Sequence, residues 1–362
     1  MKIGILTYHF AINYGAVLQC YALQQTLHEM GYDDVEIINY NTYNWRLLLQ
    51  NLPHRFSYEL FHKAYIKFSH YNSADNVFRK FVDSKLCCSS KVNMSTLPEL
   101  AKKYDAIIVG SDQVWAPRMR EGSPYFLNWK PVEYEGKRIA YAPCCMIKKI
   151  QPSQISTLTK ALNAFDWLSV RDDETRQFVS HLTGESPVTV PDPTFLYDFA
   201  LVLHNKPIIN EPYIFVYVLG TDIPGSNKEA IRKLRSLLPE TKVYAVTLSK
   251  TNPVDTSWAD KVIYDASPED WLNYVQFAKL VYTDSFHAAI FSIKFHIPFF
   301  AYYSMPSRRP RFDDLIEKFG LNENIVSDVN EINRICSINF EIDKKVFEMR
   351  NIGLDYLKNA LA

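Results

Sequence analysis

Short apolar runs alternate with longer amphipathic segments along most of the chain. In the first part, apolar runs at residues 3–7 and 35–39 flank a segment, 13–31, whose apolar positions recur at helical spacing. The segment opens at Asn13, a good helix N-cap, and closes at Gly31, a good C-terminal residue. This pattern predicts a strand–helix–strand unit, which is the building block of parallel sheets covered by helices.

The same alternation continues and then restarts after a break. It predicts strands at residues 106–112, 138–142 and 167–171, with helices at 97–103, 153–164 and 172–179. Beyond a proline-containing linker near 198–211, it predicts strands at 213–219, 243–247, 280–283 and 298–302, with helices at 227–238, from 267, 287–294, 311–319 and 344–360. Two series of this kind indicate two parallel sheets, each with helices on both faces.

Chain length supports this division, because 362 residues exceed one ordinary domain. We expect a Rossmann-like N-terminal domain at 1–200, with an aromatic-rich insertion of short helices at about 44–90. A second Rossmann-like domain is expected at 201–340. A C-terminal helix within 341–362 would pack back toward the N-terminal domain. The ligand crevice of such a protein lies at the carboxyl ends of the strands, between the domains.

Composition narrows the possible partners. Forty basic and forty acidic residues cancel, so nothing global favours nucleic acid or an anionic membrane surface. The six cysteines include two adjacent pairs and no C-x-x-C spacing, which indicates reduced thiols and a reducing compartment, the cytoplasm. No apolar run reaches the length of about 18 residues that a transmembrane helix needs, and none is expected. Local charge must therefore account for any anion binding.

Polar residues follow two strands of the first domain. Asn13, Tyr14 and Gly15 follow the first strand, where Gly15 permits close backbone approach and helix amides can hold an anion or a sugar hydroxyl. The alternative is that Asn13 only caps its helix. The run Ser111-Asp112-Gln113 follows another strand and can orient hydroxyl groups. Asp112 is a candidate base there, although turn chemistry explains it equally simply.

Arginines supply candidate anion ligands in both domains. Arg171 ends a strand, where a rigid guanidinium can bind a carboxylate or phosphate in bidentate fashion; a salt bridge to Asp172 or Asp173 is the alternative. The cluster at 308–311, with Arg309 and Arg311, opens a helix after a strand. A phosphate is its natural ligand, and a solvated loop is the alternative.

The segment 283–294 contains the candidate for acid–base chemistry. Ser285 and His287 lie where a short strand gives way to a helix, and an imidazole at such a turn can bind a charged group and move a proton. His9, after the first strand, is the next candidate histidine. No H-x-x-x-H or H-E-x-x-H motif occurs, so the sequence does not predict metal catalysis.

These motifs together resemble the polysaccharide pyruvyl transferase family. The matching segments are 4–7, 13–19, 21–23, 105–115, 169–171, 192–196, 283–287, 291–293, 298–299 and 311–316, in the family's order and over roughly residues 1–320. Each motif alone is weak, whereas the ordered set is specific. The chain departs from the family at Ala288-Ala289, where glycine commonly follows the motif histidine, and at Ser285, where some relatives carry arginine.

The resemblance implies a GT-B-like architecture and transfer of the enolpyruvyl carbons of phosphoenolpyruvate to sugar hydroxyls, which leaves a ketal-linked pyruvate. It implies His287 as general acid or donor-contacting residue and Arg171 as a ligand of the donor carboxylate or phosphate, with Arg311 adding to the phosphate site. Asn13, Asp112 and Gln113 would face the acceptor. No cofactor is implied beyond the phosphoenolpyruvate donor.

The acceptor implied is a bacterial cell-surface glycan or its lipid-linked precursor. The protein would act in the cytoplasm, and peripheral association with the inner face of the membrane stays open, as does the oligomeric state. Two alternatives remain at this stage. One is a nucleotide-sugar-dependent glycosyltransferase on the same scaffold, and the other is a glycan-binding relative without catalysis.

Overall fold

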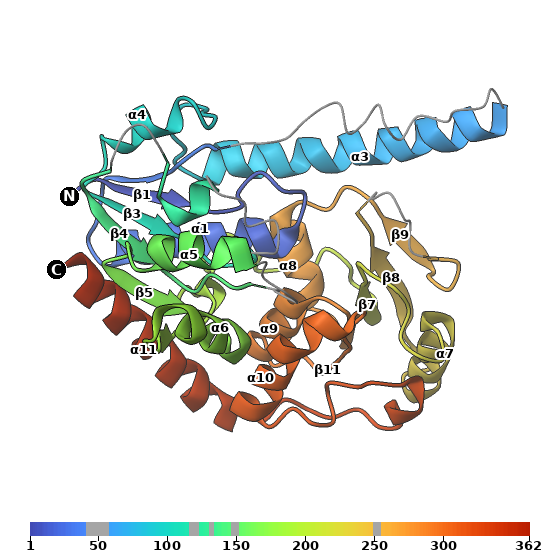
Figure 1. Ribbon diagram of the computed structural model, residues 1–362. Coiled ribbons are helices and arrows are strands. Elements are labelled where there is room, and N and C mark those ends of the chain that lie inside the picture. The colour runs from blue at the N-terminus through green and yellow to red at the C-terminus, as the bar shows by residue number, and fades with distance from the viewer. Residues whose placement is uncertain (41–57, 116–122, 130–133, 146–151, 249–254) are drawn as a thin grey trace.

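The computed structural model contains two parallel β-sheets, each flanked by helices (Figure 1). It describes the backbone of residues 1–40, 58–115, 123–129, 134–145, 152–248 and 255–362, and the side chains of these except 58–69 and 307. All strand pairs are parallel in both sheets, as the sequence pattern predicts.

The N-terminal sheet has six strands in the order β2-β1-β3-β4-β5-β6. Its strands are β1 (Ile3–Leu6), β2 (Val35–Ile37), β3 (Ala106–Val109), β4 (Lys137–Ala140), β5 (Trp167–Val170) and β6 (Val188–Thr189). Its helices are α1 (Tyr14–Glu29), α3 (Tyr58–Lys85), α4 (Leu97–Ala101), α5 (Pro152–Leu162) and α6 (Asp173–Thr183), with 3₁₀ turns η1 (Pro124–Phe126) and η2 (Pro193–Phe195). The two-residue β6 was not predicted, because so short a run has no readable period.

The C-terminal sheet has five strands in the order β11-β10-β7-β8-β9. Its strands are β7 (Tyr213–Tyr217), β8 (Lys242–Val246), β9 (Lys261–Ile263), β10 (Leu280–Thr283) and β11 (Phe299–Ala301). Its helices are α7 (Asn227–Leu237), α8 (Pro268–Gln276), α9 (Phe286–Lys294), α10 (Arg309–Phe319) and α11 (Glu341–Leu361), with 3₁₀ turns η3 (Pro306–Arg308) and η4 (Val329–Glu331). The edge strand β9 was also missed, since only three residues form it.

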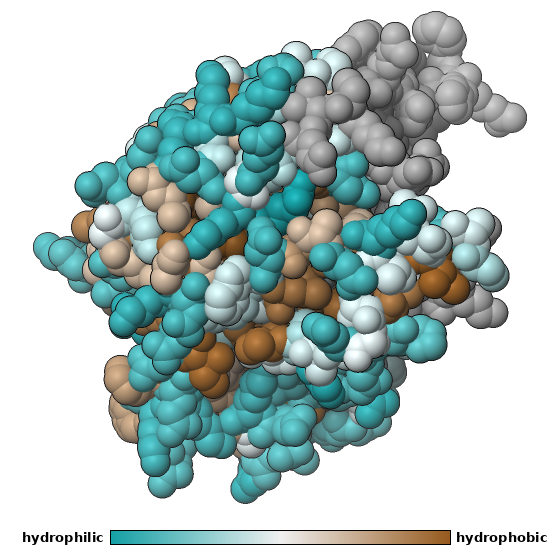
Figure 2. Space-filling view, turned by 60° about the vertical axis from the view of Figure 1, so that its left-hand side comes forward, coloured by the Kyte–Doolittle hydropathy of each residue, from teal (hydrophilic) through white to brown (hydrophobic). Residues whose placement is uncertain are grey.

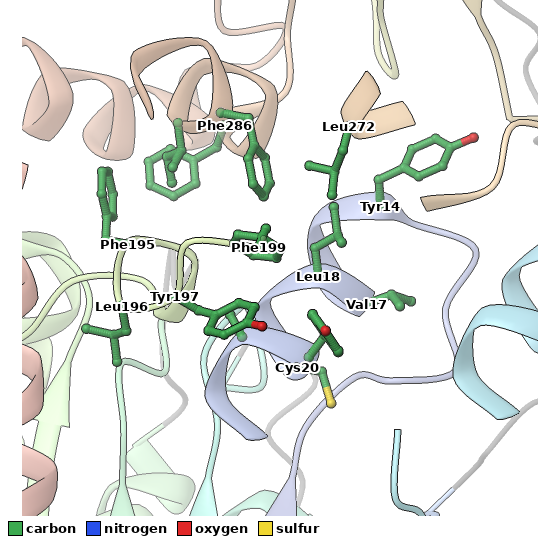
Figure 3. Packing of buried hydrophobic residues seen from close by; sticks show 14 of the residues in the cluster. Tyr14, Val17, Leu18, Cys20, Phe195, Leu196, Tyr197, Phe199, Leu272 and Phe286 are labelled. Atoms are coloured by element: carbon green, nitrogen blue, oxygen red, sulfur yellow. The ribbon is translucent and has the colours of Figure 1, made fainter. Parts of the chain in front are cut away.

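A continuous apolar core joins the two halves. Buried residues of α1 and the turn η2 meet α8 and α9 in a single hydrophobic cluster (Figure 3). Tyr14 of α1 stacks on Trp271 of α8 with ring centroids 5.1 Å apart, and its hydroxyl donates to the carbonyl of Ala266. Because this interface is apolar and closely packed, the carboxyl ends of both sheets are held in a fixed relation to each other.

The insertion at about 44–90 differs from the prediction. Residues 44–57 lie outside the described part, but the remainder forms one helix of 28 residues, α3, where short helices were expected. Its buried residues Ala74, Phe78 and Phe81 follow helical spacing, and Phe78 and Phe81 contact the rings of Tyr14 and Tyr21 on α1. This buried face anchors the C-terminal part of α3 on α1, because apolar residues at helical spacing are buried together on one side of a continuous helix.

The helix α11 follows the C-terminal half but packs on the N-terminal one. Tyr356 donates its hydroxyl to the carbonyl of Ala140 at the end of β4, and Gly353 lies against Tyr141. Figure 1 shows this helix running beside β5 and α6. The N-terminal core is therefore closed by residues that come after the whole of the second sheet.

The surface is mixed in character. Figure 2 shows one face, on which hydrophobic residues reach the surface in a broken band between hydrophilic ones. Within the described ranges, none of the helices combines the length and apolar character needed to cross a membrane.

Candidate active site

Both sheets direct their carboxyl ends toward the region where η2 meets α9. In the C-terminal sheet, β8 and β9 are added on one side of β7, and β10 and β11 on the other. The order of the strands therefore reverses between β7 and β10. In the N-terminal sheet the switch falls between β1 and β3. Ligands of open α/β sheets bind at such switch points, and the polar residues predicted from the sequence follow these strands.

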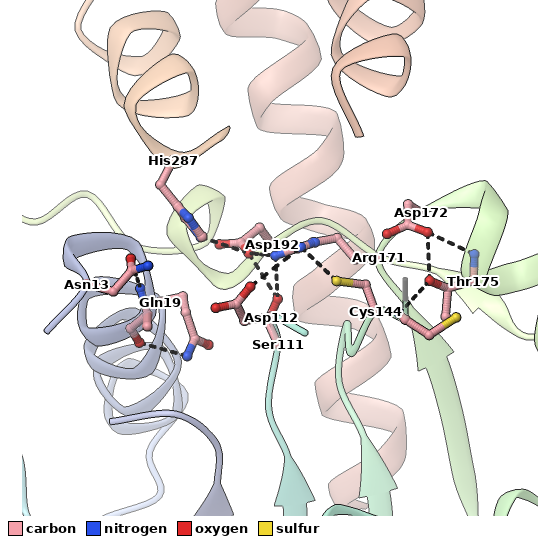
Figure 4. A network of polar contacts seen from close by, with 12 residues as sticks. Asn13, Gln19, Ser111, Asp112, Cys144, Arg171, Asp172, Thr175, Asp192 and His287 are labelled. Atoms are coloured by element: carbon pink, nitrogen blue, oxygen red, sulfur yellow. Dashed lines mark hydrogen bonds and ion pairs between the residues drawn. The ribbon is translucent and has the colours of Figure 1, made fainter. Parts of the chain in front are cut away.

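A buried ion pair forms the centre of the site (Figure 4). Arg171, which directly follows β5, is only 3% exposed and places Nη1 2.9 Å from Oδ2 of Asp192. The hydroxyl of Ser111 donates to the same carboxylate oxygen at 2.9 Å. The alternative partners of Arg171 are not used, because the Asp172 carboxylate caps α6 by accepting from the backbone N–H of Thr175. Arg171 is thus held rigidly by a network rather than by a surface salt bridge.

His287 reaches this pair from the other half of the protein. It lies in the first turn of α9, and its Nε2 is 3.4 Å from Oδ2 of Asp192. The opposite side of the ring lies against the backbone of Gly15, where any side-chain carbon would overlap the imidazole. Gly15 is therefore required for close approach, as the sequence indicated, but the group that approaches it is His287 of the protein itself.

Asp192 is a candidate site residue that the sequence analysis did not single out. It was noted only as part of the family-like run at 192–196, in a segment without strand or helix periodicity. Burial alone raises the pKa of its carboxyl, but His287 and Arg171 lower that pKa below its usual value. The Asp192 side chain therefore stays ionised between an arginine and a histidine.

A second guanidinium, that of Arg311, lies near Arg171 across a small pocket. Gln113, Cys144, Cys145 and Pro310 are among the residues that line the pocket between the two arginines. Burial and the positive charge of Arg171 lower the pKa of Arg311 to about 10. Its Nε is buried without a hydrogen-bond partner, and among the described residues no carboxylate forms an ion pair with it. The carboxylates of Asp172 and Glu174 also line this pocket, and Arg171 is already paired with Asp192. Arg311 is therefore the guanidinium that an anion entering the pocket would meet.

The other arginines of the 308–311 cluster point elsewhere. Arg309, a predicted phosphate ligand, is largely exposed and pairs with Asp313 on its own helix, 3.1 Å away. Arg308 instead turns inward, with Nη1 3.4 Å from Asp284 Oδ2 and 2.9 Å from Ser304 Oγ. The 3₁₀ turn η3 before α10 sets which arginine faces inward, and helical spacing alone does not give this.

Asp284 fills the switch point of the C-terminal sheet. Its side chain is fully buried directly after β10, and Oδ1 accepts from the backbone N–H of Leu219 at the end of β7, 2.6 Å away. A Cβ at Gly220 would lie 2.8 Å from Oδ2. Burial raises the pKa of this carboxyl, while Leu219 and Arg308 act in the opposite direction. Backbone amides that could hold a ligand phosphate are therefore occupied by the protein's own carboxylate.

Three further predicted residues have structural partners. Asn13 caps α1, its side chain accepting from the N–H of Ala16 at 3.3 Å, and Ser285 caps α9 by accepting from Ala288 at 3.4 Å. Tyr14 is completely buried in the contact between the halves, with its hydroxyl bound to Ala266. The structure thus brings Gly15 and Ser285 next to His287, whereas the Tyr14 side chain lies outside the polar cluster.

Asp112 and Gln113 lie on the pocket side of the network. Asp112 has a positive φ of 74°, a conformation that L-residues other than asparagine and aspartate seldom adopt, and its Oδ1 is 3.8 Å from Nη2 of Arg171. The adjacent Cys144 thiol, which sequence reasoning did not select, accepts from Nη2 of Arg171 at 2.8 Å. His9 is buried apart from the cluster, its Nε2 3.1 Å from Asn39 Oδ1.

Comparison with solved structures places the fold. The chain is similar to MnaA of S. aureus, solved with UDP (11% identity, TM-score 0.52, covering 98% of this chain and 91% of that one). It is also similar to HepE of Anabaena, solved with UDP and glucose (8% identity, TM-score 0.51, covering 99% and 100%). A search by sequence finds no match among curated proteins. These likenesses define a GT-B-like protein with two parallel-sheet domains, which confirms the predicted fold class.

Sequence comparison then gives the family. The polysaccharide pyruvyl transferase model matches residues 13–304, which include Arg171, Asp192 and His287. The chain therefore belongs to the polysaccharide pyruvyl transferase family and is a transferase, as the ordered motifs indicated.

Proposed function

We propose that this protein transfers pyruvate from phosphoenolpyruvate to two hydroxyls of a sugar in a cell-surface glycan or its lipid-linked precursor, forming a ketal. One observation carries the choice of donor: Arg171 and Arg311 flank one pocket, and Arg311 has no anionic partner among the described residues. Phosphoenolpyruvate carries a carboxylate and a phosphate, so it needs two cationic subsites rather than one.

The residues around Asp192 fit the proton transfer that this reaction needs. As general acid, His287, whose Nε2 is 3.4 Å from the Asp192 carboxylate, gives a proton to the methylene carbon of phosphoenolpyruvate, and an oxocarbenium-like centre forms at the adjacent carbon. One sugar hydroxyl adds to that centre and a second displaces the phosphate, each losing its proton. Asp112, beside Arg171, is the residue placed to accept a hydroxyl proton. The net products are the ketal and inorganic phosphate, and the sequence of steps requires no redox change.

The nucleotide-sugar alternative is less well supported. A nucleotide diphosphate would need free amides or a free arginine at the β7–β10 switch point, where Asp284 binds Leu219 and lies beside Arg308. The non-catalytic alternative rested on Ala288-Ala289. Both alanines are fully buried in the hydrophobic core beneath α9, so their methyl groups do not occupy ligand space.

Phosphate release from phosphoenolpyruvate tests the proposal, with nitrophenyl glycosides and lipid-linked sugars as acceptors. We expect acceptor-dependent release in the wild type, and a loss of about 10² to 10⁴ in kcat for His287→Gln with little change in phosphoenolpyruvate affinity. His204→Gln, at an exposed histidine, is the matched control. Binding of UDP- or GDP-sugars without any binding of phosphoenolpyruvate would overturn the proposal.

A further inference from the structure

A groove on the outer part of the C-terminal half lies apart from the candidate active site. It has a volume of about 380 Å³ and is lined by Ile208, Ile209, Asn210, Glu211, Tyr244, Lys261, Ile263 and Tyr274. Lys261 and Ile263 are the first and last residues of the edge strand β9, Tyr244 lies on β8, and residues 208–211 lead into β7. The groove therefore lies at the β9 edge of the C-terminal sheet. Asp284 and His287 follow the carboxyl end of β10, and neither lines this groove.

The walls of this groove are preformed. The segment that carries Ile208 is fixed to α8 by Asn273, which is fully buried, accepts from the N–H of Ile208 at 2.9 Å and donates to the carbonyl of Lys206 at 2.9 Å. On the sheet side, the Tyr244 ring packs edge-on against Tyr213, with centroids 5.6 Å apart. A ligand would therefore pay little ordering entropy on binding, since both walls are already held.

The chemistry of the lining selects a neutral ligand with hydroxyl groups. The floor is apolar and aromatic, from Ile263, Tyr244 and Tyr274, whereas the rim carries the carboxylate of Glu211, the ammonium of Lys261 and the amide of Asn210. Tyr244 donates its hydroxyl to Glu211 at 2.5 Å, and Lys261 Nζ lies 5.8 Å from the Tyr244 ring centre. One acid and one base give no net charge, which disfavours phosphates, while together they accept and donate hydrogen bonds.

A sugar ring has this same division, with an apolar C–H face and hydroxyl groups around its edge. The volume also falls within the range of about 300–1,000 Å³ that small-molecule sites occupy. We propose that this groove is a second carbohydrate-binding site, which holds a mono- or disaccharide unit of the glycan acceptor away from the reacting sugar. The choice of glycan as ligand rests on the proposed function, because an enzyme that acts on a polysaccharide meets an extended chain of such units.

Titration by ligand-observed NMR, without phosphoenolpyruvate, tests the site with lactose, cellobiose and diacetylchitobiose as probes. Ile208→Arg places a bulky charge over the groove at a side chain that is 43% exposed, so we expect the fold to be kept. The matched control is Ile155→Arg on α5, where the side chain is 42% exposed. We expect at least one probe to bind the wild type. Ile208→Arg should weaken this binding about tenfold or more, which is the effect of losing one apolar contact, and Ile155→Arg should leave it unchanged. Glu211→Gln should weaken the same probe while keeping the fold.

The outcomes separate this proposal from the proposed function. If probe binding is lost in Ile208→Arg while phosphate release with a single-sugar acceptor is kept, the second site is supported and independent of catalysis. If the wild type turns over no phosphoenolpyruvate but the probes still bind at the groove, only the proposed function fails. No binding of any probe, equal binding in both arginine variants, or a change in oligomeric mass in Ile208→Arg would overturn the second site.

Discussion

Gly15 and His287 are in direct contact across the two halves of the protein, with the backbone of one against the ring of the other. We expect Gly15→Ala to displace the imidazole from Asp192 and to lower kcat by at least about 10², because small misplacements of catalytic groups have effects of this size. Gly353→Ala, also crowded in a helix but packed on Tyr141, is the control. It should lower the melting temperature and leave kcat unchanged.

Asp192→Asn should reduce stability strongly at neutral pH, by about 3 to 5 kcal/mol, because the buried Arg171 loses its partner at 2.9 Å and keeps only the more distant Asp112 at 3.8 Å. The sign with pH follows from the lowered pKa of Asp192, to which His287 and Arg171 contribute against the effect of burial. Such a group stabilises the fold above its unfolded pKa of about 3.9 and ceases to do so at lower pH.

Urea unfolding at neutral and acidic pH measures how the free energy of unfolding changes with pH. The wild type should lose more stability on acidification than Asp192→Asn does. Asp173→Asn, at an exposed position on α6, should differ from the wild type by no more than about 0.5 kcal/mol. An equal slope with pH in Asp192→Asn and wild type would contradict the role given to Asp192.

Lys294, at the last turn of α9, donates to the carbonyl of Thr194 at 2.5 Å and to that of Tyr197. Burial lowers its pKa to about 7, whereas an unfolded lysine titrates near 10.4. Between these values the unfolded chain binds more protons, so this residue makes stability rise with pH from about 7 to about 10.4.

Lys294→Met should remove that rise, and also lower kcat modestly by loosening the contact between α9 and η2. Denaturant unfolding at several pH values between about 7 and 10.4 measures whether the free energy of unfolding still rises with pH. Lys344→Met, whose side chain is 84% exposed, should keep the wild-type slope. A rise retained in Lys294→Met would assign the pH dependence to another group.

Arg311→Met should weaken phosphoenolpyruvate binding by about ten- to a hundredfold, the range for losing a hydrogen bond to a charged group at roughly 1.5–3 kcal/mol. Arg309→Met should have no effect, since Arg309 is exposed and paired with Asp313. The affinity for phosphoenolpyruvate is measured at equilibrium from the rise in melting temperature with ligand concentration, without acceptor, so that turnover does not contribute. Equal affinities in the two variants would remove Arg311 from the donor site.

The sequence predicts the fold well because parallel strands buried on both faces leave continuous apolar runs, and their ends mark where ligands bind. For this reason the sequence predicts that His287 and Arg171 lie near the carboxyl ends of strands. Asp192 could not be placed in this way, because it lies in an irregular segment whose position depends on contacts with residues distant in sequence, such as Ser111 and Arg171.

Other features depend on packing between distant segments. The turn η3 sets which arginine, Arg308 or Arg309, faces inward. Tyr14 is buried because its ring stacks on Trp271 of the other half. The C-terminal part of α3 is held by its buried contacts with α1, whereas the local pattern of polar and aromatic residues suggested several short helices.

The position of α11 has a consequence for biosynthesis. Tyr141 of the N-terminal half is completely buried, and Gly353 and Tyr356 cover it. As the chain leaves the ribosome, the first sheet therefore exposes this surface until residues 341–361 have emerged, long after the sheet itself can form. We therefore expect the N-terminal half to be more prone to aggregation while the second half is being made than after α11 has packed.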